Sequence, residues 1–337
     1  MESCNASQSG VSSSGDSVDK SLADAKSKCG CKGVRWCAQC ENSSRVQLLS
    51  NRLASGFDEI QNYVPYVYCH SCYCGHKLPN GVYKDSNKLF ELASSEQCKI
   101  NSKKCVRENS RDIVNCVEQR EFPENLSNLD TLTLVFDFVT VDEERRLVDL
   151  FDNLGWSLSQ SGRRKQEWGP KVNFKKRKLR CLHEFIGMPG FAFELTQKMA
   201  TTSPKLAKYT PLEVANLEYD SERRASIEFH RDDTWIWGER LISINLLSGS
   251  IMTLRNTKLR QVLYVPMPRR SLLCMAGGPI RYEWEHAVLR EHISGRRIAL
   301  TMREPGRDFC PPDGELFVSL GRSLLERAST KIEPLSF

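Results

Sequence analysis

The second half of the chain carries eight short apolar segments separated by turn signals, and no other feature limits the fold as strongly. From Leu212 onward these segments are LEVANLEY, ASIEFHRD, RLISINLL, SIMTLR, QVLYVPM, SLLCMAG, EHAVL and RRIALTMR. Short runs of this kind, rich in β-branched and aromatic residues, are typical of strands. A long succession of them predicts a sandwich, a jelly roll or a barrel.

Two helices are expected before these strands. Residues 141–154 (VDEERRLVDLFDNL) place apolar side chains at helical spacing, and Thr140 followed by Glu143 predicts a capping box at their start. A second helix is expected from Pro189 to Met199, and residues 133–139 (TLVFDFV) read as a strand. The expected fold class is therefore α+β, a double-stranded β-helix (jelly roll) buttressed by helices, with a Cys-rich segment on its N-terminal side.

Changes of composition divide the chain into five regions. The first residues are rich in Ser, Asp, Ala and Gly and lack aromatic side chains, which is typical of disorder. Cysteines then cluster, and a polar stretch with scattered Cys98, Cys105 and Cys116 follows. We expect a disordered tail at 1–27, a Cys-rich zinc-binding module at 28–80, a linker at 81–128, the β-domain at 129–310 and a C-terminal extension at 311–337.

The sequence contains neither a recognisable secretory signal nor a candidate membrane span, and both observations bear on the cellular compartment. The N-terminus has neither the basic start nor the apolar core of a secretory signal, and no run of about 18 apolar residues marks a membrane span. We therefore expect a cytoplasmic and nuclear protein without a membrane partner. In such reducing compartments the 14 cysteines are expected to be thiols or metal ligands.

A candidate metal site lies in the segment IEFHRDD, where His230 and Asp232 are two residues apart. Side chains alternate along a strand, so both would point to one face. A second histidine from a distant strand, His286 or His292, would complete two imidazoles and one carboxylate, the facial set that suits Fe(II). The pair alone also fits a surface histidine beside a solvated carboxylate.

The last strand pattern strengthens the metal hypothesis. Arg297, Ala299, Thr301 and Arg303 alternate with apolar residues, so two guanidinium groups flank small side chains on one strand face. A buried guanidinium fork requires an anionic partner and binds carboxylates through two parallel hydrogen bonds. This face therefore fits a dicarboxylate, although an exposed face with solvated arginines would have the same pattern.

Together these residues resemble the AlkB family of Fe(II)- and 2-oxoglutarate-dependent dioxygenases over roughly residues 130–305. The order Tyr219, His230-Arg-Asp232, His286 and Arg297-x5-Arg303 is similar to the pattern of that family. Four longer segments resemble the AlkB homologue 4 subfamily. They are CGCKGVRWCAQCE (29–41), SLSQSGRRKQEWGPKVNF (157–174), DDTWIWGERLISINLLS (232–248) and WEHAVLREHISGRRIALTMRE (284–304).

The resemblance assigns roles to individual residues. It implies that iron is held by His230, Asp232 and His286. Arg297 would pair with the distal carboxylate of 2-oxoglutarate, to which Tyr219 would donate a hydrogen bond, and Arg303 would lie nearer the end that chelates iron. His292 would then be a loop or structural residue.

Two positions depart from the family pattern. AlkB proteins usually have Asn two residues before the Tyr, whereas this chain has Leu217 there and Asn216 three residues before Tyr219. Trp168 stands where relatives usually have Tyr, so a hydroxyl contact is lost while stacking can remain. The asparagine contact to the cosubstrate is therefore not expected in its usual form.

The resemblance also implies a reaction, the oxidative removal of N-methyl groups. Within the homologue 4 subfamily the implied substrate is monomethyl-lysine of actin, with effects on actomyosin and cytokinesis, and N6-methyladenine in DNA is the alternative. From the residues alone, a non-catalytic nucleic-acid or cytoskeletal binding module also fits, and its binding would not respond to 2-oxoglutarate. A cupin-type enzyme with another metal fits less well, because the arginine pair would have no role.

The positive charge of the chain indicates an anionic substrate and does not distinguish between classes of anionic substrate. The chain has a formal charge of +6, and residues 163–180 alone hold nine Lys and Arg against one Glu. Such a patch suits nucleic-acid phosphates or an acidic protein such as actin, and Lys175–Lys178 also fits a nuclear import signal or a solvated surface. The candidate substrate contacts are Arg163, Arg164, Lys165, Trp168, Lys171 and Trp235.

The cysteines suggest a second metal. Four of them lie within 12 residues in the pattern Cys29-x-Cys31-x5-Cys37-x2-Cys40, and closely spaced Cys pairs of this kind chelate Zn²⁺. A second group follows about 30 residues later and contains Cys69, His70, Cys72, Cys74 and His76. The two groups could form separate sites, or Cys37, Cys40, Cys69 and Cys72 could form one ribbon-like site. Free thiols and a redox pair are the alternatives.

Overall fold

The computed structural model describes residues 29–49, 56–79, 84–93, 125–127, 129–180, 184–306 and 318–332. The expected tail at 1–27 and most of the expected linker at 81–128 lie outside the described residues, as do Cys98, Cys105 and Cys116. No helix among the described residues is both long enough and apolar enough to cross a membrane.

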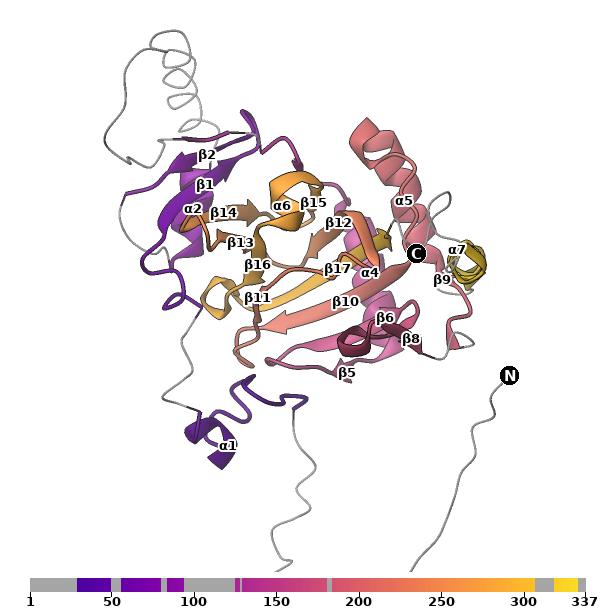
Figure 1. Cartoon of the computed structure of the whole chain (residues 1–337), viewed down its shortest axis with the longest axis horizontal. Helices are drawn as coiled ribbons and strands as arrows, with labels where there is room; N and C mark the ends of the chain where they lie inside the picture. The colour runs from indigo at the N-terminus through magenta and orange to yellow at the C-terminus, as the bar shows by residue number, and fades with distance from the viewer. Residues whose placement is uncertain are drawn as a thin grey trace, which may run out of the picture.

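All eight strands expected after Leu212 are present. They are β10 (Glu213–Asp220), β11 (Ile227–His230), β12 (Trp237–Leu246), β13 (Ser250–Asn256), β14 (Gln261–Met267), β15 (Leu272–Ala276), β16 (Glu285–Val288) and β17 (Arg296–Pro305). They form two antiparallel sets, β15-β12-β17-β10 and β11-β16-β13-β14 (Figure 1). Consecutive strands mostly alternate between the two sets, which is the jelly-roll arrangement that the sequence predicted.

Further strands extend each set at its edges. Sheet A has the order β11-β16-β13-β14-β1-β2-β3, and sheet B has the order β4-β15-β12-β17-β10-β6-β5. These edge strands are β1 (Val64–Cys69), β2 (Cys74–Lys77), β3 (Asn125–Leu126), β4 (Leu132–Val135), β5 (Ser157–Leu158) and β6 (Arg164–Trp168). Each added strand covers backbone groups that an open edge would leave unpaired.

The expected Cys-rich region at 28–80 is divided in space. Strand β1 pairs in parallel with β14, and β2 pairs with β1, so residues 64–77 belong to sheet A of the β-domain. Residues 29–49, which include α1 (Ser44–Gln47), instead lie beside the end of β11, away from the β1–β2 hairpin (Figure 1). Backbone pairing with β14 joins residues 64–77 to the fold. No local sequence pattern predicts this pairing.

The two expected helices form and cover sheet B. Helix α4 (Val141–Leu154) begins with the predicted capping box of Thr140 and Glu143, and α5 (Gly190–Thr202) matches the second expected helix. Leu147 of α4 and Phe191 of α5 are completely buried in the same core as the strands. This apolar contact is what holds the helices against the sheet.

The remaining described elements are short. They are α2 (Ser86–Leu92), β7 (Lys171–Asn173), β8 (Lys178–Arg180), β9 (Met188–Pro189), α6 (Gly278–Tyr282), α7 (Val318–Ala328) and β18 (Lys331–Ile332), with 3-10 turns at Phe174–Lys176, Pro204–Leu206 and Arg290–His292. Strand β18 pairs with β9, and Leu324 of α7 is buried in the main core. The described part of the expected C-terminal extension therefore packs on the domain.

Candidate active site

The structure brings His230, Asp232 and His286 together, as the sequence predicted. His230 ends β11 and lies opposite His286 in the register of β11 and β16, with the two ring centroids 4.3 Å apart. Asp232 follows β11, and its two carboxylate oxygens lie 4.0 Å from Nε2 of His230 and 3.9 Å from Nε2 of His286. One ligand atom from each residue lies within 4.8 Å of the others, which is the arrangement of a facial triad.

Hydrogen bonding selects the nitrogen through which His230 would bind a metal. Its Nδ1 lies 2.8 Å from the backbone oxygen of Glu228, an atom that can only accept a hydrogen bond. The proton therefore belongs on Nδ1, which leaves the Nε2 lone pair directed at Asp232 and His286. Partners of this kind set the tautomer and orientation of histidine ligands in metal sites.

The charges around the triad keep its ligands ready for a cation. Burial would raise the pKa of Asp232, but Arg303 and the two imidazoles outweigh burial and hold that pKa well below its usual range. Burial and the neighbouring His230 lower the pKa of His286 to about 3. Near neutral pH the group therefore offers one carboxylate and a neutral His286, the protonation states that metal binding requires.

Arg303 contacts both the triad and the neighbouring strand β10. One of its terminal nitrogens donates to Oδ1 of Asp232 at 3.1 Å, and the other contacts the carboxylate of Glu213 on the neighbouring strand β10. Its Nε is buried without a hydrogen-bond partner among the described residues. The second arginine thus orients the carboxylate ligand and retains one donor for an anion.

Arg297 has the properties of an anion-binding group. It is completely buried, and its Nε donates to the side-chain oxygen of Asn245 on β12. Its Nη1 and Nη2 have no hydrogen-bond partner among the described residues. An unpaired pair of guanidinium donors in a buried site is costly, so a carboxylate that accepts both hydrogen bonds fits here.

The pocket that holds these groups lies between the two sheets. Residues that line it include Leu217, Tyr219, His230, Asp232, Ser243, Met252, His286, Arg297, Thr301 and Arg303. The four residues predicted to share one face of the last strand, from Arg297 to Arg303, all line it. With three candidate metal ligands on one wall and, on another, a guanidinium fork that no described residue pairs with, the pocket fits a dicarboxylate that also chelates a metal.

The two departures from the family pattern have structural explanations. Asn216 points away from the pocket, where its amide nitrogen donates to Gln166 at 2.9 Å, and Leu217 lines the pocket in its place. Trp168 packs edge-to-face on Phe191 of α5, with ring centroids 5.4 Å apart. Strand alternation thus presents an apolar side chain where the asparagine contact would be.

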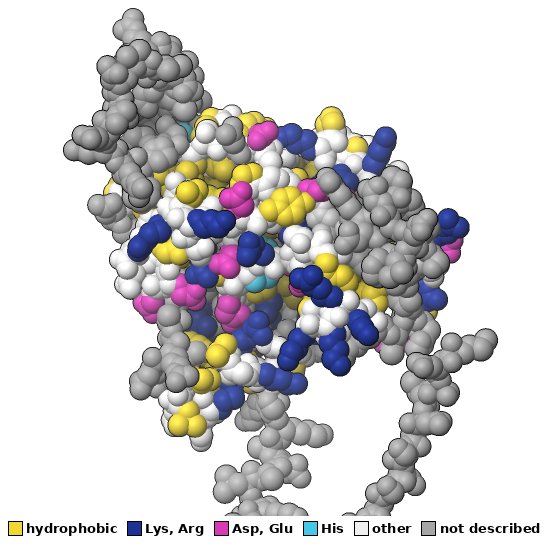
Figure 2. Space-filling model, viewed as in Figure 1, with side chains coloured by type: hydrophobic (Ala, Val, Ile, Leu, Met, Phe, Trp, Pro, Cys, Tyr) yellow, Lys and Arg dark blue, Asp and Glu magenta, His cyan; other side chains and the backbone are white. Residues whose placement is uncertain are grey.

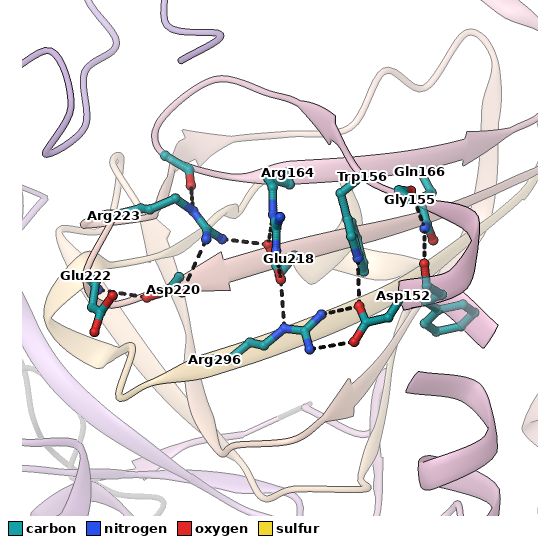
Figure 3. Close-up of polar contacts among 12 residues, drawn as sticks. Asp152, Gly155, Trp156, Arg164, Gln166, Glu218, Asp220, Glu222, Arg223 and Arg296 are labelled. Carbon is teal, nitrogen blue, oxygen red and sulfur yellow. Dashed lines mark hydrogen bonds and ion pairs between the residues drawn. The ribbon is translucent and has the colours of Figure 1, made fainter. Parts of the chain in front are cut away.

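The candidate substrate residues fall into different environments. Arg164 does not face solvent freely, because its guanidinium binds the completely buried carboxylate of Glu218. Arg223 and Arg296 bind the same carboxylate, and Arg296 continues to Asp152 (Figure 3). The network lies on the outer side of β10, so Arg164 is engaged by the fold, and a substrate contact by Arg164 stays a prediction.

The other candidates lie nearer the surface. Lys165 and Lys171 approach the exposed Glu167 at 2.6 and 3.9 Å, and both line a groove with Trp168 and the exposed Phe174. Glu213, which contacts Arg303, also lines this groove and so connects it with the metal pocket. The candidate residue Trp235 packs against the core, and Arg163 lies with its guanidinium carbon 5.9 Å from the Tyr219 ring centroid.

Basic side chains gather beside this groove. The hairpin of β7 and β8 exposes Lys171, Lys175, Lys176, Arg177 and Lys178. Figure 2 shows Lys and Arg side chains around the hollow at the centre of this face, over the region of β6 to β8. The positive patch predicted from residues 163–180 therefore lies next to the pocket.

The two cysteine groups occupy different places, and the single ribbon-like site is not formed. Cys29, Cys31, Cys37 and Cys40 make one compact group, and Cys69, Cys72 and His76 at the β1–β2 hairpin make another. Of the other expected members, His70 packs on Phe136 and Cys74 donates to the backbone oxygen of Cys72. None of the described cysteines forms a disulfide bond.

Sequence reasoning missed two residues that support the site, Asn245 and Glu228. Asn245 is a polar residue within the apolar strand β12 and is completely buried, which was the available signal. Glu228 acts through its backbone oxygen, for which the sequence offers no signal. His292, the alternative third ligand, is buried between Phe57 and Tyr264, away from the triad.

Comparison with known proteins gives consistent matches. A DNA N6-methyl adenine demethylase of Caenorhabditis elegans is 40% identical over 316 residues, covering 94% of this chain and 99% of that protein. Alpha-ketoglutarate-dependent dioxygenase alkB homolog 4 of Mus musculus is 39% identical over 227 residues, and that of Homo sapiens is 40% identical over 225 residues. Each covers 58% of this chain, and 74% and 73% of the mouse and human proteins.

Two further comparisons add little. The solved structure of OsALKBH1 covers 52% of this chain and 96% of its own, with a TM-score of 0.40 and 13% sequence identity. This similarity is too weak to strengthen the sequence matches. No family model matches the chain.

Proposed function

The chain belongs to the AlkB family of 2-oxoglutarate-dependent dioxygenases, next to the AlkB homologue 4 proteins, and from this premise we propose that it demethylates N6-methyladenine in DNA. That it is an oxidative demethylase follows from the family. The adenine base is our proposal. It is supported by the nearly full-length match to a DNA N6-methyl adenine demethylase and by the basic surface beside the pocket.

The pocket residues suit the cofactors of the family. Bound Fe(II), with 2-oxoglutarate and O₂, supplies the oxidation of an N-methyl group that ends in release of formaldehyde. We infer that His230, Asp232 and His286 hold the iron. Arg297, whose two terminal nitrogens pair with none of the described residues, would bind the distal carboxylate of 2-oxoglutarate beside Tyr219. Arg303 would hold Asp232 in place and direct its free Nε toward the other end of the cosubstrate.

The groove beside the pocket suits a nucleotide. Lys165 and Lys171 line it, the exposed hairpin lysines stand beside it, and Trp168 and Phe174 add aromatic surface. Cationic side chains bind phosphates, while aromatic side chains stack on unpaired bases. A base that enters the pocket must leave the helical stack, so single-stranded or distorted DNA is the preferred form of substrate.

Monomethyl-lysine of actin, the substrate expected first from the resemblance, stays a prediction. The names of the matched relatives mention an adenine base or a dioxygenase and do not mention a protein substrate. Localisation to both cytoplasm and nucleus likewise stays a proposal. A DNA substrate would favour the nucleus.

The test measures succinate and formaldehyde with Fe(II) and 2-oxoglutarate. One reaction contains a single-stranded oligonucleotide with N6-methyladenine, and a parallel reaction contains an actin peptide with monomethyl-lysine. The wild-type protein should release formaldehyde from the oligonucleotide, and His230→Ala should release none. His70→Ala, a histidine packed on Phe136 outside the triad, serves as the matched control. Release of formaldehyde from the peptide and not from the oligonucleotide would contradict the DNA proposal and indicate a protein substrate.

A second variant tests the basic surface itself. The double variant Lys175→Glu, Lys176→Glu reverses the charge at two exposed positions of the hairpin. Neither position is one of the proposed metal ligands. We expect KM for the oligonucleotide to rise about tenfold or more and to depend less on salt, because fewer phosphates are neutralised. Succinate formed without any substrate should be unchanged. An unaltered KM for the oligonucleotide would contradict the role of this surface.

A further inference from the structure

The four cysteines at 29–40 form a compact group outside the active site. Their Sγ atoms all lie within 4.8 Å of one another. Those of Cys37 and Cys40 are 3.9 Å apart, nearly twice the length of a disulfide bond, and none of the four forms a disulfide with a described residue. Four cysteine sulfurs gathered around one point are the ligand set of a closed, tetrahedral zinc site.

The backbone around this group is already folded for a metal. The backbone nitrogen of Cys40 donates to the oxygen of Cys37 at 3.0 Å, which closes the turn between the two residues. The Sγ of Cys40 accepts from the backbone nitrogen of Cys37 and from Arg45, each at 3.4 Å. These hydrogen bonds fix the position of the Cys40 sulfur, as the outer hydrogen-bond partners of metal ligands do.

The segment has only a small apolar core of its own. Within residues 29–49 only Cys37 and Val46 are buried, while Val34 and Leu48 are 63% and 85% exposed. So small an apolar core cannot offset the conformational entropy of about 20 ordered residues. Small units of this kind depend on disulfides or a structural metal, and here the cysteines are not paired in disulfides.

The segment is tightly attached to the β-domain. Two guanidinium groups contact the Trp36 ring, with the guanidinium carbons of Arg224 and Arg290 at 4.7 and 3.7 Å from the ring centroid. Arg224 also pairs with Glu41 at 2.6 Å. At Gly30 the approach is so close that a Cβ would come within 2.6 Å of the backbone oxygen of Ser159.

One contact of the segment reaches the residue that orients His230. Arg35 donates to the carboxylate of Glu228 at 3.3 Å and to Gln160 at 2.6 Å, and Ser161 donates to the same carboxylate. The backbone oxygen of Glu228 is the atom that orients His230. Contacts therefore run from the cysteine segment through Arg35 and Glu228 to His230, the proposed iron ligand.

We propose that Cys29, Cys31, Cys37 and Cys40 bind one Zn²⁺, and that the zinc-held segment positions Glu228 and through it His230. Zinc at this site does not touch the reacting atoms. The positioning part rests on the proposed iron site, whereas the zinc part does not. Loss of zinc should loosen residues 29–49 and raise the dissociation constant for Fe(II) about three- to tenfold, the effect of losing one hydrogen-bonded support.

The metal itself is tested on the full chain by elemental analysis. Cys37→Ser with Cys40→Ser should contain one equivalent of zinc less than the wild-type protein. Cys274→Ala, a buried cysteine of β15 outside both groups, should keep the wild-type content. Replacement of zinc by Co(II) should add the strong absorption of tetrahedral thiolate-bound cobalt, weakened in the double variant. Equal zinc in wild type and double variant would overturn the site.

Positioning is tested separately by anaerobic titration with Fe(II), followed by calorimetry. Arg35→Ala keeps all four cysteines, so it should keep its zinc and still bind Fe(II) more weakly. Lys32→Ala, an exposed residue of the same segment, is the control and should leave Fe(II) affinity unchanged. Unchanged affinity in Arg35→Ala would overturn the positioning role. Neither readout depends on turnover, so a failure of the proposed demethylation would leave both conclusions intact.

Discussion

Arg297 donates a hydrogen bond from Nε to the side-chain oxygen of Asn245, and this contact orients the other two guanidinium nitrogens, which no described residue pairs with, at the pocket. Asn245 is itself fixed, because its amide nitrogen donates to the backbone oxygens of Ser248, Met267 and Pro268 at 2.8 to 3.1 Å. A buried asparagine on β12 thus links a loop of the jelly roll to the proposed cosubstrate ligand.

Replacing Asn245 should weaken 2-oxoglutarate binding without removing any group that touches it. In Asn245→Ala the guanidinium loses its buried acceptor and gains freedom to rotate. We expect KM for 2-oxoglutarate to rise about tenfold, as one charge-assisted hydrogen bond is lost, with a smaller change in kcat. Steady-state succinate formation provides the measurement. Asn256→Ala, a buried asparagine at the end of β13, is the comparison, and equal effects in both variants would indicate a general loss of packing.

Arg297 itself should be needed as an arginine and not merely as a cation. Lysine offers a single ammonium group and cannot form two parallel hydrogen bonds with a carboxylate. We expect Arg297→Lys to raise KM for 2-oxoglutarate about a hundredfold, in line with about 3 kcal/mol for a buried, charge-assisted pair. The corresponding change at Arg240, which pairs with Glu304 in the same sheet, should leave this KM near the wild-type value. A wild-type KM in Arg297→Lys would remove this residue from the cosubstrate site.

Leu217 offers a gain-of-affinity experiment. It lines the pocket at the position where the family usually has asparagine, while Asn216 faces the other way. Leu217→Asn would add an amide donor on the cosubstrate side of β10. One additional neutral hydrogen bond should lower KM for 2-oxoglutarate about three- to tenfold, provided that the added polar side chain keeps that partner. Leu217→Ala removes the same side chain without adding a donor and should not lower it.

Much of this site was predictable from the sequence because strand alternation is a local rule. His230 and Asp232 are two residues apart, and Arg297 to Arg303 alternate with apolar residues, so each set could be assigned to one strand face before the fold was known. The eight strand segments and the capping box at Thr140 were likewise local patterns. Local patterns of this type gave the jelly roll and its two helices.

What could not be predicted depends on contacts between distant residues. Arg164 was counted in a basic patch, yet it binds Glu218, which is 54 residues away in the chain. Strand β1 joined sheet A through parallel pairing with β14, and this pairing placed the second cysteine group away from the first. A backbone oxygen orients His230, and the sequence cannot predict this contact because every residue carries a backbone oxygen. Residue types alone do not encode such pairings.

The Glu218 network should make stability depend on pH. Burial would raise the pKa of Glu218, but Arg164, Arg223 and Arg296 outweigh it and lower that pKa below its usual value. A carboxylate with a lowered folded-state pKa stabilises the fold fully above its unfolded-state pKa, about 4.3, and this contribution declines as the pH falls through the folded-state pKa. Glu218→Gln should therefore lower the free energy of unfolding by about 2–4 kcal/mol at pH 7, since three arginines lose a buried partner.

Below about pH 4 the difference between Glu218→Gln and wild type should shrink, because the wild-type carboxylate becomes protonated and resembles the amide. Urea unfolding at a series of pH values measures this difference directly. Glu222→Gln, an exposed carboxylate of the loop that follows β10, should unfold like the wild type at each pH. A difference that stays constant from pH 7 to pH 3 would mean that Glu218 contributes through shape and hydrogen bonding, and that its charge is not what the three arginines require.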